Sequence, residues 1–165
     1  FFTKLKMRNK YLFIKKNIYF FIFAIIVFFF DRFSKLKIVN NFNENSYYVN
    51  DFINLDLIWN IGIGFGLLST NSTLIYNLMT FLIGLVILIL IYFLTISKKI
   101  DKFIYSIIIG GALGNFYDRV IYKAVPDFID LHYNNFHWFT FNVADIFITI
   151  GIILLLARDL LIKNV

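Results

Sequence analysis

Four apolar stretches separated by polar segments set the pattern of the chain. They cover about residues 17–33, 74–96, 103–119 and 136–157. A helix needs about 20 residues to cross the hydrocarbon of a bilayer, and most of these stretches approach or exceed that length. The pattern therefore predicts four membrane-spanning helices in a single polytopic domain, residues 1–165.

The first stretch also has features of a signal peptide, because a basic segment precedes its apolar run. No small-residue cleavage site follows Phe30, however, and three further apolar stretches come after it. We therefore expect this segment to be retained as a membrane span.

The polar segments between the stretches differ in character. From Ile53 to Asn60 apolar and polar residues alternate, with one exception at Ile58, and this period of two predicts a half-buried strand within an outer segment of about residues 36–73. Glycines that are too flexible for a strand centre follow at Gly62, Gly64 and Gly66. About residues 120–135 are expected to form an outer loop. The predicted fold is a mainly α integral membrane protein, a four-transmembrane-helix bundle with a small extracytoplasmic β element.

Composition supports a membrane protein and excludes several kinds of site. The chain is 60% hydrophobic and 16% charged, with a mean hydropathy of +0.77, whereas soluble domains are roughly 45–50% apolar and about 25% charged. It contains no cysteine, which excludes disulfides, Cys-ligated zinc and thiol nucleophiles. Its two histidines are too few for a convincing metal site, so no metal and no cofactor are expected.

The net charge of +6 comes from basic residues that gather outside the spans. Cytoplasmic segments of membrane proteins are enriched in Lys and Arg. The distribution predicts that both termini are cytoplasmic, and it indicates a topology signal rather than a nucleic-acid surface, so no nucleic-acid partner is expected. The residues concerned are Lys4, Lys6, Arg8, Lys10, Lys15, Lys16, Lys98, Lys99, Lys102, Arg158 and Lys163.

Asp145 lies inside the fourth apolar stretch. An ionised carboxylate deep in a bilayer costs on the order of 3 kcal/mol, so Asp145 should face the bundle interior or a water-filled cavity. It is either a functional group or the structural partner of a buried Arg or Lys. Asn142 precedes it by three residues, as Asn115 precedes Asp118. This spacing places an amide beside a carboxyl on one helix face, either to orient the carboxyl or to bind neighbouring helices together.

Two further patterns surround these carboxyls. Gly110, Gly111 and Gly114 precede Asn115, and such small residues let helices approach closely. Asp31 and Lys35 are four residues apart at the end of the first stretch, where they either neutralise each other or belong to a site.

Together, these motifs resemble those of the bacterial lipoprotein signal peptidase (signal peptidase II) family over about residues 31–151. Three blocks are similar to Gly-Gly-Ala-x-Gly-Asn-x-x-Asp-Arg, Val-x-Asp-Phe and Phe-Asn-x-Ala-Asp, at residues 110–119, 125–128 and 141–145. Residues 60–66 are similar to the Asn-x-Gly-x-Ala-Phe region, and residues 31–35 to Asp-Gln-x-Thr-Lys. The departures are Arg32, Ser34, Gly64 and Pro126, and none of them replaces a carboxyl.

The resemblance implies an intramembrane aspartyl endopeptidase with Asp127 and Asp145 as its catalytic pair. Composition and spacing alone do not distinguish Asp127 from Asp118, which the resemblance makes a supporting residue with the adjacent Arg119 as its ion-pair partner. The supporting or substrate-binding residues that the resemblance implies are Asp31, Lys35, Asn60, Gly111, Asn115, Asp118, Arg119, Asn142 and Ala144.

The substrates that the resemblance implies are diacylglyceryl-modified prolipoproteins, cleaved before the lipidated Cys. The implied partners are this substrate and membrane lipid, and the implied setting is the bacterial inner membrane, with the protein expected to act as a monomer. The alternative is a proton-coupled transporter, which also places carboxylates in spans, although transporters usually have more spans and inverted repeats. For a catalytic pair, the segment that holds Asp127 must fold back onto the outer ends of the third and fourth spans.

Overall fold

The computed structural model describes residues 2–41, 46–62, 72–134 and 136–163, in which four helices and four strands form. In chain order the elements are α1 (Phe2–Asn41), β1 (Tyr47–Asn50), β2 (Ile53–Asn60), α2 (Thr73–Ile96), α3 (Lys99–Tyr122), β3 (Val125–Tyr133), β4 (Phe136–Phe141) and α4 (Val143–Lys163).

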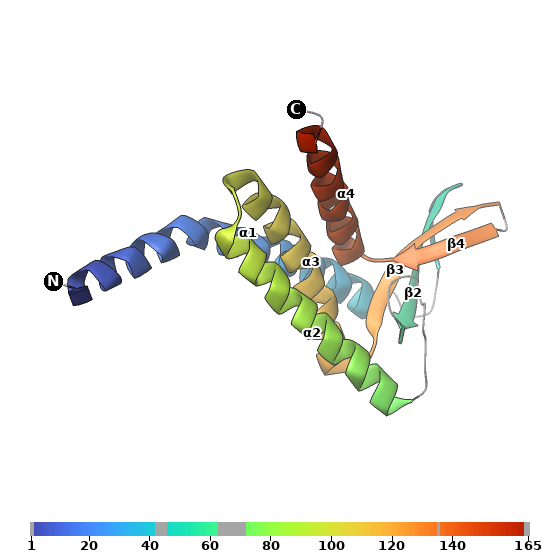
Figure 1. Cartoon of the computed structure of the whole chain (residues 1–165). Coiled ribbons are helices and arrows are strands. Elements are labelled where there is room, and N and C mark those ends of the chain that lie inside the picture. Colours follow the sequence, from blue (N-terminus) through green and yellow to red (C-terminus); the bar gives the residue numbers. More distant parts are fainter. Residues whose placement is uncertain (1, 42–45, 63–71, 135, 164–165) are drawn as a thin grey trace.

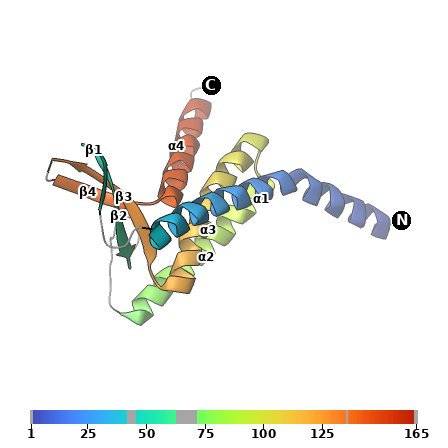
Figure 2. The ribbon, with the colours of Figure 1, turned by 180° about the vertical axis from the view of Figure 1, so that it is seen from behind.

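Helix α3 is the centre of the helical part and packs against α1, α2 and α4 (Figures 1 and 2). Its glycines make this possible. A methyl group added at Gly110 would lie 2.6 Å from the Ala24 carbonyl oxygen of α1, and one added at Gly111 would lie 2.7 Å from the Ala144 carbonyl oxygen of α4. The expectation that these glycines provide close helix packing is confirmed.

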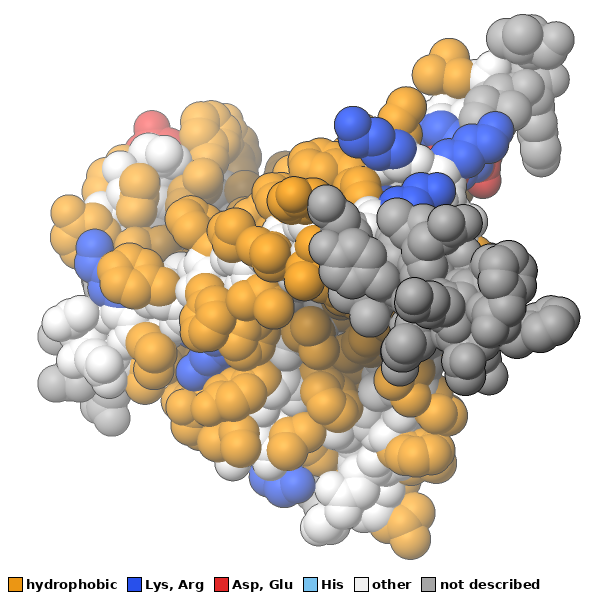
Figure 3. Space-filling model, turned by 90° about the vertical axis from the view of Figure 1, so that its left-hand side faces the viewer, with side chains coloured by type: hydrophobic (Ala, Val, Ile, Leu, Met, Phe, Trp, Pro, Cys, Tyr) orange, Lys and Arg blue, Asp and Glu red, His pale blue; other side chains and the backbone are white. Residues whose placement is uncertain are grey.

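Within the part of the chain that the structure describes, two helical segments are long and apolar enough to cross a membrane, Lys16–Asn41 and Thr73–Ile96. Only 28% and 17% of their most apolar windows are buried within the protein, whereas the core helix of a soluble protein is mostly buried. Their apolar side chains therefore point outward, as lipid-facing side chains do. Figure 3 shows hydrophobic side chains spread over one such face.

The strands form one antiparallel sheet in the order β1-β2-β3-β4. The predicted strand from Ile53 to Asn60 is confirmed as β2. The sheet lies at one end of the helical part, away from the turn between α2 and α3 (Figure 1). In its centre β2 and β3 pair so that Ile58 is opposite Asp127.

Two expectations about the C-terminal half are wrong. Residues 120–135 are not a loop, because they contain the end of α3 and all of β3. The helix expected over residues 136–157 starts only at Val143, because Phe136–Phe141 is strand β4. Strand β4 is rich in aromatic residues, which are as apolar as the residues of a membrane span but favour strands.

The first helix also differs from its expected extent, since α1 continues to Asn41 rather than ending near residue 33. Gly62 lies two residues after the end of β2, but Gly64 and Gly66 lie outside the described residues.

Candidate active site

Asp127 lies on β3 and is buried, with 3% of its surface exposed. Two asparagine side chains hold its carboxylate: Nδ2 of Asn60, at the end of β2, donates to Oδ2 over 2.8 Å, and Nδ2 of Asn142 donates to Oδ1 over 2.6 Å. Pairing of β3 with β2 and β4 thus brings Asp127 to the start of α4.

Asp145 lies in the first turn of α4, not in the middle of an apolar span. Asn142 does not share a helix face with it, because the helix begins one residue later at Val143. Instead the two residues cap the helix reciprocally. The Asp145 N–H donates to Asn142 Oδ1 over 3.2 Å, and the Asn142 N–H donates to Asp145 Oδ2 over 3.1 Å. The capping arrangement fixes the carboxylate at the helix N-terminus.

Asn142 therefore contacts both carboxylates of the candidate pair. Its side-chain NH₂ reaches Asp127, and its backbone N–H reaches Asp145. The segment that holds Asp127 folds back onto the ends of α3 and α4, as a pair acting on one bond requires. Asp145 is half-buried and borders a groove lined by Phe139, Phe141, Ile146, Thr149 and Ile150.

A buried lysine, Lys35, is connected to the pair through Asn115. Lys35 has no exposed surface, and its Nζ lies 2.8 Å from Asp31 Oδ2, 2.8 Å from Asp118 Oδ2 and 2.7 Å from Asn115 Oδ1. Asn115 then donates from Nδ2 to Asp145 Oδ1 over 2.8 Å. Asp31 and Lys35 do neutralise each other, but within a network that reaches Asp145.

Asp31 also connects this network to α4. Its Oδ1 accepts the Ala144 N–H over 2.9 Å, at the helix end where a carboxylate is favourable. Ala144 is fully buried against Gly111, and a methyl group at Gly114 would collide with the Asp31 carboxyl. Small residues at these positions are what allow the carboxyl and the helix end to meet.

Asp118 is paired, but not with Arg119 as expected. Its ion-pair partners are Lys35 and Arg32, whose guanidinium also lies 4.6 Å from the centre of the Tyr117 ring. Adjacent residues on a helix point about 100° apart, so Asp118 and Arg119 face different neighbours. Sequence reasoning noted Arg32 only as a departure from the family pattern. No spacing in the sequence relates Arg32 to Asp118, because 86 positions separate them and only the packing of α1 against α3 brings them together.

Arg119 holds backbone groups instead. It donates to the Asn115 carbonyl oxygen over 3.2 Å and to the Gly62 carbonyl oxygen over 3.1 Å. It thereby ties α3 to the segment that follows β2, and with it to Asn60. Every sequence-predicted site residue thus lies in this one region at the meeting of α1, α3, α4 and the sheet.

The surroundings of Asp127 favour its protonated form. Burial, followed by the negative charge of Asp145, raises the pKa of Asp127 to about 6, against the hydrogen bonds from Asn60 and Asn142, which lower it. Two carboxyls in these surroundings can hold one proton between them, which is the arrangement needed for acid and base catalysis on one bond.

The chain is similar to proteins of one known family. The family model described as signal peptidase (SPase) II matches residues 23–161. A lipoprotein signal peptidase of Pelagibacter ubique (strain HTCC1062) is 46% identical over 165 residues, which cover 98% of this chain and 95% of the relative. Another, from Francisella tularensis subsp. novicida (strain U112), is 36% identical and covers 92% of this chain and 97% of its own length.

Solved structures are similar as well. One bacterial membrane enzyme superposes with a TM-score of 0.71 at 32% identity, covering 84% of this chain and 85% of that one. A second superposes with a TM-score of 0.66 at 31% identity, covering 83% and 89%.

Replacing Lys35 should destabilise the protein strongly. Lys35→Met leaves Asp31 and Asp118 buried without their shared cation, which should cost on the order of 3–5 kcal/mol. The measurement is thermal unfolding of the purified chain in detergent. Lys37→Met, two residues further along the same helix and exposed, is the matched control. Equal melting temperatures for the two variants would contradict the assigned role.

Replacing Asp127 should change how stability depends on pH. Because folding raises its pKa from 3.8 to about 6, the folded state binds the proton more tightly. The carboxyl therefore supports folding fully below pH 3.8, and this support is lost as pH rises through about 6, on the order of 3 kcal/mol in all. Asp127→Asn lacks this loss, so its melting temperature relative to wild type should rise between pH 4 and pH 7.5.

The change with pH, not the constant offset, is the test, because the substitution also alters hydrogen bonds to Asn60 and Asn142. Asp51→Asn removes a carboxyl from the exposed turn between β1 and β2 and controls for charge removal. A melting temperature of Asp127→Asn that, relative to wild type, stays constant or falls as pH rises would refute the burial argument.

Proposed function

The chain belongs to the signal peptidase II family, and from this we propose that it is a membrane protease that removes signal peptides from lipoproteins. The observation that carries the proposal is the pair Asp127 and Asp145, joined through Asn142. The transporter alternative is not supported, since the family model and both relatives bear the name of a signal peptidase.

The proposed reaction is aspartyl-type hydrolysis. Burial and the charge of Asp145 raise the pKa of Asp127 to about 6, so Asp127 binds a proton more readily than an ordinary carboxyl, and in the proposed reaction it is the member that carries the shared proton. Asp145 is then the base that takes a proton from the attacking water. Asp127 donates its proton to the carbonyl oxygen of the scissile bond as the water oxygen bonds to the carbonyl carbon. When the C–N bond then breaks, Asp145 gives its proton to the leaving amine and Asp127 takes back a proton from a hydroxyl of the tetrahedral intermediate. The protonation state belongs to the pair as a unit.

The remaining site residues position this pair. Asn60, Asn115 and Asn142 each direct an NH₂ group at one of the two carboxylates. Asp31, Lys35 and Asp118 hold Asn115, and Arg119 holds the segment after Asn60. Gly111 and Ala144 permit the close approach of α3 and α4.

The proposed substrates are diacylglyceryl-modified prolipoproteins, cut before the lipidated Cys. A groove lined mainly by apolar side chains reaches Asp145 from the sheet and α4. The exposed apolar helices keep the protein in lipid, where the acyl chains of such a substrate also lie. We propose that the protein acts as a monomer, with the pair and its supporting residues within one chain.

We further propose four spans, one in each of α1 to α4, with both termini cytoplasmic in the bacterial inner membrane. Lys98, Lys99 and Lys102 at the turn from α2 to α3 support this orientation. Arg158 near the end of α4 pairs with Asp101 near the start of α3, so the ends of these helices meet far from the sheet (Figure 1). The candidate pair and the sheet then lie at the outer face.

Topology can be tested with reporter fusions. A reporter placed after Lys99 should report the cytoplasm, and one placed after Asp51, in the turn between β1 and β2, should report the opposite side. A reporter at the C-terminus, which should again be cytoplasmic, is the control. Signals from the same side at Lys99 and Asp51 would refute the four-span arrangement.

The pair itself can be tested by non-additivity. If Asp127 and Asp145 act as one unit, removing either should cost nearly as much hydrolysis as removing both. Asp127→Asn, Asp145→Asn and the double variant should show similar residual cleavage of lipidated precursor by purified protein. Membrane insertion and melting temperature are measured in parallel.

Asp130→Asn is the matched control, because Asp130 lies on β3 three residues from Asp127 and has separate contacts. It should retain most activity. A double variant whose loss equals the product of the single losses would show that the two carboxyls act independently.

A further inference from the structure

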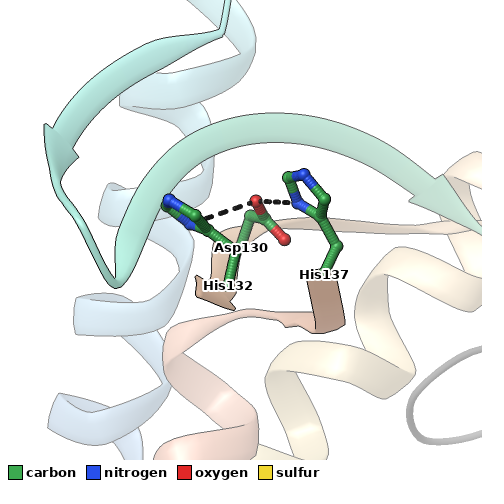
Figure 4. Close-up of side chains that lie close together, drawn as sticks. All are labelled: Asp130, His132 and His137. Atoms are coloured by element: carbon green, nitrogen blue, oxygen red, sulfur yellow. Dashed lines mark hydrogen bonds and ion pairs between the residues drawn. The ribbon is translucent and has the colours of Figure 1, made fainter. Parts of the chain in front are cut away.

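The only two histidines of the chain meet at one carboxylate (Figure 4). His137 Nδ1 lies 2.7 Å from Asp130 Oδ2, and His132 Nδ1 lies 3.6 Å from the same atom. One ligand atom from each of the three residues lies within 4.8 Å of the others. No step proposed for the candidate active site uses these residues.

The sheet explains why the three side chains meet. Asp130 and His132 are two apart on β3, so they point to the same face, and His137 is directly opposite His132 on β4. Asp127, three residues before Asp130, points to the other face. The cluster is therefore separate from the candidate catalytic pair, on the same strand.

Two polar atoms near Asp130 lack hydrogen-bond partners among the described residues. His132 is 93% buried, as its exposed fraction is 7%, and its buried Nδ1 points toward Asp130 without a hydrogen bond. Asn54 is directly opposite Asp130 on β2, and its buried Oδ1 is likewise unpaired. Buried polar atoms without partners are uncommon and call for an explanation.

The hydrogen bond between Asp130 and His137 gives a partner to only one of the two imidazoles and leaves His132 Nδ1 without one. The rings of His132 and His137 are stacked, with centroids 5.3 Å apart, and both present Nδ1 to one oxygen. A cation between them would satisfy His132 Nδ1 together with the other two ligand atoms. Its bound water would give Asn54 Oδ1 a donor.

The chemistry of the donors selects the ion. Two imidazole nitrogens and one carboxylate oxygen suit zinc and related divalent transition metals, whereas calcium and magnesium prefer oxygen ligands. Metal–ligand bonds of about 2.0–2.1 Å in a tetrahedron place ligand atoms roughly 3.3 Å apart. The existing separations of 2.7 and 3.6 Å lie on either side of that value. The side chain of His137 is 58% exposed, so it can adjust and leaves the ion a route from solvent.

We propose that Asp130, His132 and His137 form a binding site for a divalent transition-metal ion of the zinc class, with one position left for water. The ion ties β3 to β4 near the hairpin end of the two strands, where Tyr133 pairs with Phe136. The sequence alone predicts no metal site, because the chain has only two histidines. Their spacing does not reveal that they lie opposite each other on paired strands.

The test uses the full chain without a polyhistidine tag, purified in detergent and treated with a chelator. Titration with Zn²⁺ in a calorimeter should show one site per chain. At free Zn²⁺ about 100 times the dissociation constant, the melting temperature should rise by on the order of 5 °C. Mg²⁺ and Ca²⁺ at the same concentration should not reproduce the rise.

Zn²⁺ binding by variants of the three residues tests whether they are the ligands. His137→Ala removes a ligand whose side chain is 58% exposed, and it should weaken Zn²⁺ binding by on the order of 100-fold or more. His132→Ala and Asp130→Asn should do the same. Asp51→Asn, a carboxyl elsewhere on the sheet, and the double variant Asp127→Asn/Asp145→Asn should bind Zn²⁺ as wild type does.

Three results would overturn the proposal. These are absence of Zn²⁺ binding by the wild-type chain at micromolar concentrations, unchanged binding by a folded His137→Ala variant, and loss of binding in the Asp127/Asp145 double variant. The last result would place the ion at the candidate catalytic pair instead.

Discussion

The ammonium group of Lys35 is surrounded by three oxygens, from Asp31, Asp118 and Asn115, and no part of the residue is exposed. A buried cation costs several kcal/mol unless its partners are close and correctly placed. The requirement sets the relative positions of α1 and α3, which supply these oxygens. Through the bond from the Ala144 N–H to Asp31 it also sets the start of α4. The positions of the site residues therefore depend on this one buried charge.

An ammonium can only donate hydrogen bonds, and this gives the network a direction. Asn115 must turn its carbonyl oxygen to Lys35, which leaves its NH₂ for Asp145. Asn142 follows the same rule, because its oxygen accepts the Asp145 N–H and its NH₂ reaches Asp127. The side-chain oxygen of Asn60 accepts a hydrogen bond from the Gly62 N–H, and its NH₂ group donates to Asp127. Each amide is thus oriented by a second partner, and each presents a donor to a carboxylate.

The place of the site follows from the cost of charge in lipid. Ionised groups near the middle of a bilayer are expensive, and here Asp127 and Asp145 lie at the meeting of the sheet with the helix ends. Proposed hydrolysis needs water at the scissile bond, and a lipid-anchored substrate keeps its acyl chains in the bilayer. A site between the apolar helices and the sheet serves both needs. The sheet supplies Asp127 and Asn60, which no arrangement of the helices alone would bring there.

The sequence by itself determined the apolar helices, the strand β2 and the chemical groups of the site. Hydropathy was sufficient for α2, alternation was sufficient for β2, and the glycines before Asn115 indicated close packing. Tertiary structure decided the rest. Hydropathy does not distinguish an aromatic strand from a helix, so β4 and the true start of α4 were hidden. Asp118 pairs with Arg32, 86 positions away, rather than with its neighbour Arg119, because a helix turns adjacent side chains apart. Likewise His132, His137 and Asp130 meet only because β3 and β4 pair in one register, and register is a property of the folded sheet.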